Sequence, residues 1–265
     1  MTPASNPLRN NLLAALPPDV WERILPSLEH VIVEGGQVLS TPGQAMSHAY
    51  FPTSSVLSTM HCTVNGSSAE TAAAGNDGMA ELWSVMGGGA NASRTVVRAG
   101  GSAFRLPAEV LAEEFHRNGA MMQLLLRYSG FLMTQTSQRT VCNRHHNMSQ
   151  QLARALLEQL DRVEGYQLLL TQDAIAEQLG VRRASVSCAS GALQRLGIIR
   201  YGRGRITVLD RPALGRMTCE CYGVVQRESR RLLPASIRSG RLQAAVDEEL
   251  EAGRSTRAPV GSAAA

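Results

Sequence analysis

The stretch LLLTQDAIAEQLGVRRASVSCASGALQRLGIIRYGRGRITV, residues 168–208, decides the fold. The segment from Thr171 to Leu179 starts with a capping-type threonine and has one apolar face, which predicts a first helix. Gly180 then breaks the pattern, and within three residues a second helical period begins. Its predicted apolar stripe is Val186, Ala189, Leu193 and Leu196, with Arg183, Ser187 and Gln194 facing the other way. Two helices so close together must cross sharply.

After Gly197 the apolar period changes from 3.6 to 2. Ile198-Ile199 and Ile206–Val208 flank the sequence Tyr-Gly-Arg-Gly-Arg, which predicts two strands around a glycine-containing turn. A helix, a tight turn, a second helix and a hairpin are the outline of a winged helix-turn-helix. In such a unit the second helix lies in the major groove of DNA.

The positive charge of the chain is concentrated in the same region. Residues 178–219 hold eight arginines and one acid, a local balance of +7 in a chain whose total is +4. Residues 1–107 carry a balance of −2. Phosphates would therefore be met by the C-terminal part of the chain.

The length of 265 residues permits two ordinary domains. No run of eighteen apolar residues exists and the N-terminus lacks the layout of a secretory signal, so we expect a cytoplasmic protein without membrane contact. Five cysteines are an odd number and make a disulfide framework improbable. Cys219-Glu-Cys221 is the one close pair, without a second cysteine pair or a histidine pair beside it, so the spacing predicts no metal site.

The first half of the chain has the texture of a β domain. After a helical lead-in at residues 8–30, short β-branched or alternating runs from Val31 to Leu106 are separated by Gly, Pro, Asn and Asp. This pattern favours an antiparallel sandwich or jelly roll.

A long helix is predicted from Pro107 to about Asn143. Met121, Leu125, Tyr128 and Leu132 keep the 4-3-4 spacing of a coiled-coil seam. A helix packed on its own β domain is the alternative interpretation. Residues 143–149 are the predicted hinge, with Ser149 as the cap of a further helix at 150–163.

The predicted fold class is α+β. The expected domains are a β domain resembling cyclic-nucleotide-binding domains, a long dimerisation helix, a winged helix-turn-helix and a flexible tail, at residues 8–107, 108–146, 147–228 and 229–265. Ala213 to Leu233 is predicted to be helical.

The order of these parts resembles the Crp/Fnr family of bacterial transcription regulators, over roughly Leu12 to Leu214. The segments with the closest resemblance are TQDAIAEQLGVRRASVS and GIIRYGRGRITV. YFPTSSVLS, GNDGMAEL, CNRHHNMSQQLARALL, VRRASVSCASGALQ and CECYGVV resemble one proteobacterial branch of the family. The resemblance implies a homodimer that binds a palindromic operator in double-stranded DNA and acts on RNA polymerase.

The resemblance also implies roles for individual residues. Arg183 matches the family's guanine-reading arginine, for which a bidentate contact to O6 and N7 is possible. The other expected DNA contacts, mostly to phosphates, are Thr171, Gln172, Arg182, Ser185, Ser187, Arg203 and Arg205. Ala184 and Cys188 stand where better-known members have a glutamate and a second arginine, so the usual operator is not transferred.

The effector is the open part of the resemblance. The residues matching the family's cyclic-nucleotide motif are Gly78, Glu81, Arg94, Thr95, Thr136 and Ser137, with the ribose-binding half altered. A cyclic nucleotide or haem is possible, and His145 and His146 beside Cys142 could offer ligands. Adjacent histidines project about 100° apart on a helix, which favours hinge or surface positions instead. Cys188 is expected to be small and buried or groove-facing rather than a redox switch.

Two further classes stay open. A metal-dependent enzyme of the cupin type would need clustered histidines and a glutamate in the β region, but His48 and His61 have no third partner at motif spacing. No nucleophile elbow, Walker loop or dinucleotide fingerprint occurs either, so no enzyme is predicted. A DNA-binding protein that senses nothing is the other alternative.

Overall fold

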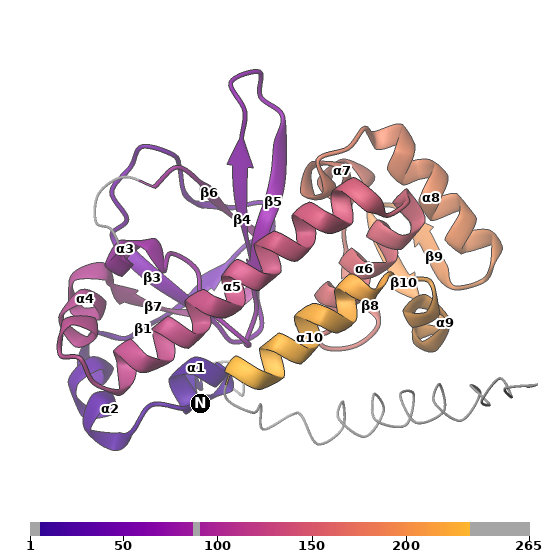
Figure 1. Cartoon of the computed structure of the whole chain (residues 1–265). Coiled ribbons are helices and arrows are strands. Elements are labelled where there is room, and N and C mark those ends of the chain that lie inside the picture. The colour runs from indigo at the N-terminus through magenta and orange to yellow at the C-terminus, as the bar shows by residue number, and fades with distance from the viewer. Residues whose placement is uncertain (1–5, 87–90, 234–265) are drawn as a thin grey trace, which may run out of the picture. The chain divides into compact units, whose positions relative to one another are not determined.

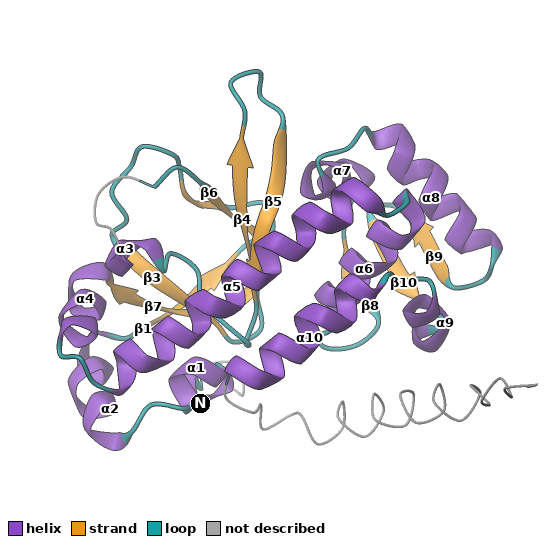
Figure 2. Ribbon diagram, viewed as in Figure 1, coloured by secondary structure: helices purple, strands orange, loops and turns teal. Residues whose placement is uncertain are grey.

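The computed structural model describes residues 6–86 and 91–233 (Figures 1 and 2). The helical lead-in consists of short turns: η2 (Pro7–Arg9), α1 (Asn11–Ala14), α2 (Pro18–Ile24) and η3 (Leu25–Ser27). Asn10 caps α1, because its side chain accepts hydrogen bonds from the backbone N–H groups of Leu12 and Leu13. The lead-in breaks up because prolines recur along it and lack the N–H that a continuous helix needs.

In the described residues, seven antiparallel strands make the two sheets of the β domain (Figure 2). One sheet has the order β1-β7-β3 and the other β2-β6-β4-β5. The strands are β1 (Glu29–Val33), β2 (Val38–Ser40), β3 (His48–Pro52), β4 (Val56–Cys62), β5 (Ser68–Ala74), β6 (Arg94–Ala99) and β7 (Gly101–Pro107). A short helix, α3 (Trp83–Met86), follows β5. The predicted antiparallel sandwich is confirmed. The glycine loop at 87–89 lies outside the described residues.

The predicted long helix is two helices, α4 (Ala108–His116) and α5 (Ala120–His145). The break falls at residues 117–119, where Asn118 has a φ of +57° in the left-handed region. The predicted long helix is therefore confirmed as α5, but it starts at Ala120, and the first part of the predicted range is the separate helix α4.

The residues of the predicted coiled-coil seam lie inside the chain's own core. Met121, Leu125 and Tyr128 are buried in the core of the β domain, and Leu132 packs against it. The Tyr128 hydroxyl donates to the Met79 carbonyl at 2.6 Å and accepts from the Met79 N–H at 3.0 Å. The alternative interpretation, a helix packed on its own β domain, is correct for this face.

The next helix, α6 (Met148–Leu160), begins at a capping box rather than at Ser149. The Asn147 side chain accepts from the Gln150 N–H at 3.0 Å, and the Gln150 side chain accepts from the Asn147 N–H at 3.1 Å. Ser149 lies within the first turn, so its assignment as the cap was wrong.

The C-terminal half forms a second core around α6. Its elements are β8 (Gln167–Leu169), α7 (Gln172–Leu179), α8 (Arg183–Arg195), β9 (Ile199–Gly202), β10 (Arg205–Val208), α9 (Arg211–Arg216) and α10 (Glu220–Leu232). The predicted hairpin β9–β10 gains a third strand, because β8 pairs with β10. The α10 helix packs along α5 (Figure 1).

The first residues of the predicted tail, 229–232, continue α10. Residues 234–265 lie outside the described part of the chain. Within 6–86 and 91–233, no helix has both the length and the apolar character needed to cross a bilayer.

Candidate nucleic-acid interface

The helix-turn-helix is built by its cap and its turn. Thr171 caps α7 as predicted, since its Oγ1 accepts from the Ala174 N–H at 3.1 Å. Gly180 has a φ of +65°, and this left-handed residue turns the chain so that α8 starts at Arg183. Helix α8 buries Val186, Ala189, Ser190 and Leu193. Leu196, predicted on the same stripe, is 63% exposed because α8 ends at Arg195.

The first turns of α8 present an open surface. Arg182, Arg183, Ser187 and Cys188 are exposed, and Ser185 is half-buried. Arg182 caps the helix by position only, since its side chain makes no capping hydrogen bond. The Arg183 Nε lies 3.6 Å from the Asp173 Oδ1, and both side chains are about two-thirds exposed. A contact so exposed is weak, so the Arg183 guanidinium is available to a ligand.

The hairpin β9–β10 is closed by a two-residue turn. Arg203 and Gly204 have φ values of +50° and +73°, the pattern of a type I′ turn. Arg203 and Arg205 are exposed, and Arg205 Nη1 lies 3.4 Å from the Gln167 Oε1 to which it donates. The Gln172 N–H donates to the Tyr201 hydroxyl at 3.1 Å. The backbone N–H of this predicted phosphate donor is therefore already used in a hydrogen bond to the hairpin. Only the Gln172 side chain is left to contact a phosphate.

Seven of the eight arginines in this region are exposed. The exception is Arg211, whose Nη2 lies 2.5 Å from the Asp161 Oδ1. Tyr222 and Gln226 also donate to Asp161, at 2.8 and 2.7 Å. Burial raises the pKa of Asp161, although Arg211 opposes the shift. The positive surface is thus slightly smaller than the sequence count implies.

A groove of about 770 Å³ runs beside α8. Cys188 and Ser185 line it from α8, and Asn147, Met148 and Arg216 line it from elsewhere in the same domain. The exposed Cys188 thiol is free. Cys188 is therefore exposed rather than buried.

A cavity of about 490 Å³ lies between the β domain and α5. Of the six residues expected to bind an effector, Glu81, Thr136 and Ser137 line it. The remaining lining is mostly apolar and includes Ala72, Ala74, Met79, Leu82, Trp83, Leu132 and Met133. Gly78 is covered by Tyr128, because a Cβ there would lie 2.5 Å from the Tyr128 hydroxyl.

Arg94 and Thr95 do not line this cavity. Arg94 pairs with Glu177 of α7, and Arg98 Nη1 lies 3.3 Å from the Glu177 Oε2. Burial alone would raise the pKa of Glu177, but the charges of Arg98 and Arg94 outweigh it and lower the pKa. Thr95 is buried, and its N–H donates to the Ser40 hydroxyl at 3.3 Å. The structure therefore splits the expected effector set.

A chain of buried charges joins the β domain, α5 and α6. Arg139 of α5 bonds Glu70 of β5 at 2.6 Å and Glu158 of α6 at 2.9 Å. Arg154 Nη1 lies 2.9 Å from the second oxygen of Glu158, and Gln178 of α7 donates to Glu70 at 3.1 Å. Burial alone would raise the pKa of Glu158, but Arg154, Arg139 and Arg162 lower it to about 2.

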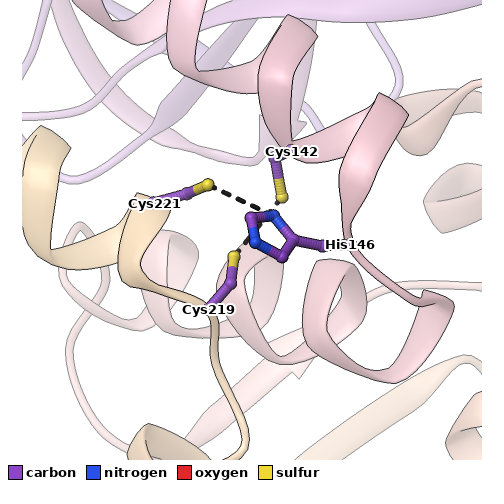
Figure 3. Close-up of side chains that lie close together, drawn as sticks. All are labelled: Cys142, His146, Cys219 and Cys221. Atoms are coloured by element: carbon purple, nitrogen blue, oxygen red, sulfur yellow. Dashed lines mark hydrogen bonds between the residues drawn. The ribbon is translucent and has the colours of Figure 1, made fainter.

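Spacing in the sequence missed one group of residues. Cys142, His146, Cys219 and Cys221 come together at the end of α5 and the start of α10, with their donor atoms all within 4.8 Å of one another (Figure 3). The sequence spacing predicts no metal site, whereas the fold brings together four residues of ligand type. The usable signal was the mixed pattern Cys-x3-His, which puts two ligands on one helical face, together with Cys-x-Cys. His145, by contrast, is exposed.

Comparison with known proteins identifies relatives of the helix-turn-helix domain and of the fold. Residues 150–217 match the model of the Crp-like helix-turn-helix domain. A search of curated proteins gave no match.

Among solved structures, a protein from Eubacterium rectale assigned to the Crp/Fnr family of transcriptional regulators is similar, with a TM-score of 0.60 and 19% identity over 79% of this chain and 98% of that one. FixK2 from Bradyrhizobium japonicum has a TM-score of 0.60 at 14% identity, over 72% of this chain and 98% of its own. The c-di-GMP-responsive regulator CLP from Xanthomonas campestris has a TM-score of 0.58 at 13% identity, with the same coverage.

At these identities the solved structures establish the fold, and the matched domain establishes the helix-turn-helix type. Residues 150–217 are therefore a Crp-like helix-turn-helix domain, and the chain shares its fold with solved structures described as Crp/Fnr-type regulators.

Proposed function

We propose that the chain binds a palindromic operator as a homodimer, with each α8 in the major groove of one half-site. The observation that carries this proposal is the exposed, positively charged start of α8, where Arg183 is 67% exposed. A guanidinium at this position suits a bidentate contact to guanine O6 and N7. Two copies related by a two-fold axis would read inverted half-sites.

The other interface residues are proposed to hold phosphates. Thr171 uses its Oγ1 lone pair to cap α7, so its hydroxyl proton is left to donate. Arg182 and Ser187 flank the base-reading position, with Ser185 half-buried between them. Arg203 and Arg205 extend the positive surface along the hairpin.

Proposed domain boundaries follow the elements, at 107/108 before α4 and at 146/147 before α6.

We propose the outer face of α5 as the dimer contact. Leu126, Met133 and Val141 are exposed on this helix, and Met133 is 71% exposed. Leu126 and Val141 lie opposite the stripe that Met121 and Tyr128 bury in the β domain, and Met133 lies at the edge between this face and the cavity that it also lines. Pairing these faces across a two-fold axis would cover the apolar side chains.

Met133→Glu is expected to convert the dimer to a 28.5 kDa protomer, because two carboxylates would face each other across the axis. Light scattering after size exclusion measures the mass. In selection from a random DNA pool, wild type should enrich inverted half-sites about 10 bp apart from centre to centre. The variant should enrich no spaced pair.

Ile32→Glu is the matched control, since Ile32 is also a large exposed side chain, at 68%, but lies on β1. It should leave the mass and the selected sequence unchanged. A wild-type protein that is monomeric and enriches no sequence would contradict the proposed function.

Arg205→Ala should weaken binding to all DNA sequences alike, because Arg205 is proposed to contact phosphate only. The slope of log K against log salt should fall by about one unit per half-site. Fluorescence anisotropy over a salt series measures the slope. Arg117→Ala, an exposed arginine after α4, is the control, and equal slopes for wild type and Arg205→Ala would rule out the contact.

The β domain is proposed to act as the effector-sensing or purely structural module. The cavity with Glu81, Thr136 and Ser137 has mostly apolar walls, and Arg94 is engaged with Glu177. This arrangement favours a largely apolar effector over a cyclic phosphate. A regulator of this type acts on RNA polymerase at bacterial promoters, and we therefore place it in the cytoplasm.

A further inference from the structure

We propose that Cys142, His146, Cys219 and Cys221 bind one Zn²⁺ ion (Figure 3). Cys142 lies near the end of α5 and His146 is the residue that ends it. Cys219 is the N-cap of α10 and Cys221 lies in its first turn. The three cysteines are buried free thiols, and His146 is half-buried.

The spacing of the donors suits a single tetrahedral ion. Sulfur at about 2.3 Å and imidazole nitrogen at about 2.0–2.1 Å from zinc imply donor separations of roughly 3.5–3.8 Å. The Cys142 and Cys219 sulfurs are 3.5 Å apart, and the Cys221 sulfur is 3.4 Å from the His146 Nδ1. An iron-sulfur cluster carries its own sulfides between the irons, and its cysteines must stand much further apart. The group is therefore compact enough for one ion only.

The orientation of His146 gives independent support. Its Nδ1 faces the sulfurs, while its Nε2 lies 3.2 Å from the Glu220 Oε2. A zinc-bound histidine commonly gives its other ring N–H to a carboxylate, which fixes the ring and raises its basicity. Glu220 stands between the two α10 cysteines in sequence, so the same turn supplies two ligands and the carboxylate.

The surroundings also suit thiolates. The Gln138 side-chain N–H donates to the Cys221 sulfur at 3.1 Å. Three thiolates and one Zn²⁺ leave a net charge of −1, and the positive end of the 13-residue α10 lies against it. The three thiol protons pass to the buffer when zinc binds. Four protein ligands fill the coordination shell, as in structural rather than catalytic zinc sites.

The position of the site indicates what zinc would do. Cys142 and His146 precede the helix-turn-helix domain in the chain, and Cys219 and Cys221 follow it. Zinc would therefore tie both ends of that domain to the end of α5. On the proposed function, this bond would set how the two copies of α8 are held relative to the dimer helix.

The test uses the full chain purified with a thiol reductant. Mass spectrometry should find one zinc per chain in wild type and none in Cys219→Ser. Cys188→Ser, which removes an exposed cysteine outside the group, should keep its zinc. Cobalt exchanged into wild type should give the thiolate charge-transfer bands of a tetrahedral site, and Cys219→Ser should lack them.

Glu220→Gln keeps the test valid if Cys219→Ser fails to fold, since Glu220 is 72% exposed. We expect zinc affinity to fall about 10- to 100-fold, measured by competition with a chelating dye. Glu228→Gln, also on α10, should keep the wild-type affinity. Equal zinc in wild type and Cys219→Ser, bound iron with sulfide, or a Cys142–Cys219 disulfide without metal would overturn the proposal. Because zinc is measured without DNA, loss of operator binding alone would instead count against the proposed function.

Discussion

Arg183→Ala will lose affinity for the selected operator by about 1–3 kcal/mol per half-site, and so by about 2–6 kcal/mol for a dimer with two. Arg183 starts α8, is two-thirds exposed, and is held only by a 3.6 Å contact to Asp173. Ala184 and Cys188 offer no guanidinium at the positions where other base-reading side chains would stand, and the neighbouring Arg182 at the N-cap is proposed to hold phosphate. Preference should relax at one base pair in each half-site.

Two comparisons separate base reading from general attraction. Arg183→Lys keeps the charge but loses the planar fork, so it should keep the salt slope of wild type and lose most of the sequence preference. Binding to random DNA measures the affinity that does not depend on the DNA sequence. An equal loss on operator and random DNA after Arg183→Ala would reduce Arg183 to a phosphate contact.

Glu158→Gln should lower the free energy of unfolding at pH 7 by about 3–5 kcal/mol, because it removes the shared partner of two buried arginines. Arg139 keeps its contact to Glu70, but Arg154 has no other ion pair in the described part of the chain. Urea unfolding followed by circular dichroism measures the change.

The stabilisation by Glu158 is expected to depend on pH. The pKa of Glu158 is about 2 in the folded chain against an ordinary 4.5. Because the pKa of Glu158 is lower in the folded than in the unfolded chain, its ionised form stabilises the fold at pH values above about 4.5. This stabilisation is lost as the pH falls from about 4.5 to 2. The difference in free energy of unfolding between wild type and Glu158→Gln should therefore become smaller as the pH falls over that range. Glu164→Gln breaks an exposed pair with Arg9 and should cost only about 0–1 kcal/mol at any pH. A gap of constant size would show that Glu158 does not titrate as described.

Local rules account for the part of the fold that the sequence predicted well. Thr171 caps α7 because its side chain bonds an amide three residues on, and Gly180 turns the chain because it tolerates a positive φ. Both effects act within a few residues, so they can be read from a short stretch. The hairpin turn at Arg203-Gly204 is of the same kind.

The sequence predictions and the structure differ where two contacting segments are far apart in the chain. Met121 and Tyr128 recur at a spacing that fits a coiled-coil seam and an internal core equally well, and only the fold shows that they face the β domain. Similarly, Arg94 fits a phosphate-binding pattern, but in the structure it meets Glu177, 83 residues further on. Cys142 and Cys219 are 77 residues apart, so no local spacing could bring them together.

The meeting of Cys142 with Cys219 has a consequence for how such proteins diversify. The polypeptide leaves α5 and, after the whole helix-turn-helix domain, returns to nearly the same point before α10 runs back along α5 (Figure 1). The segment 147–218 is thus an insertion whose two ends lie next to each other in space. Recombination could exchange this segment for another DNA-binding unit while the β domain and α5 stay intact.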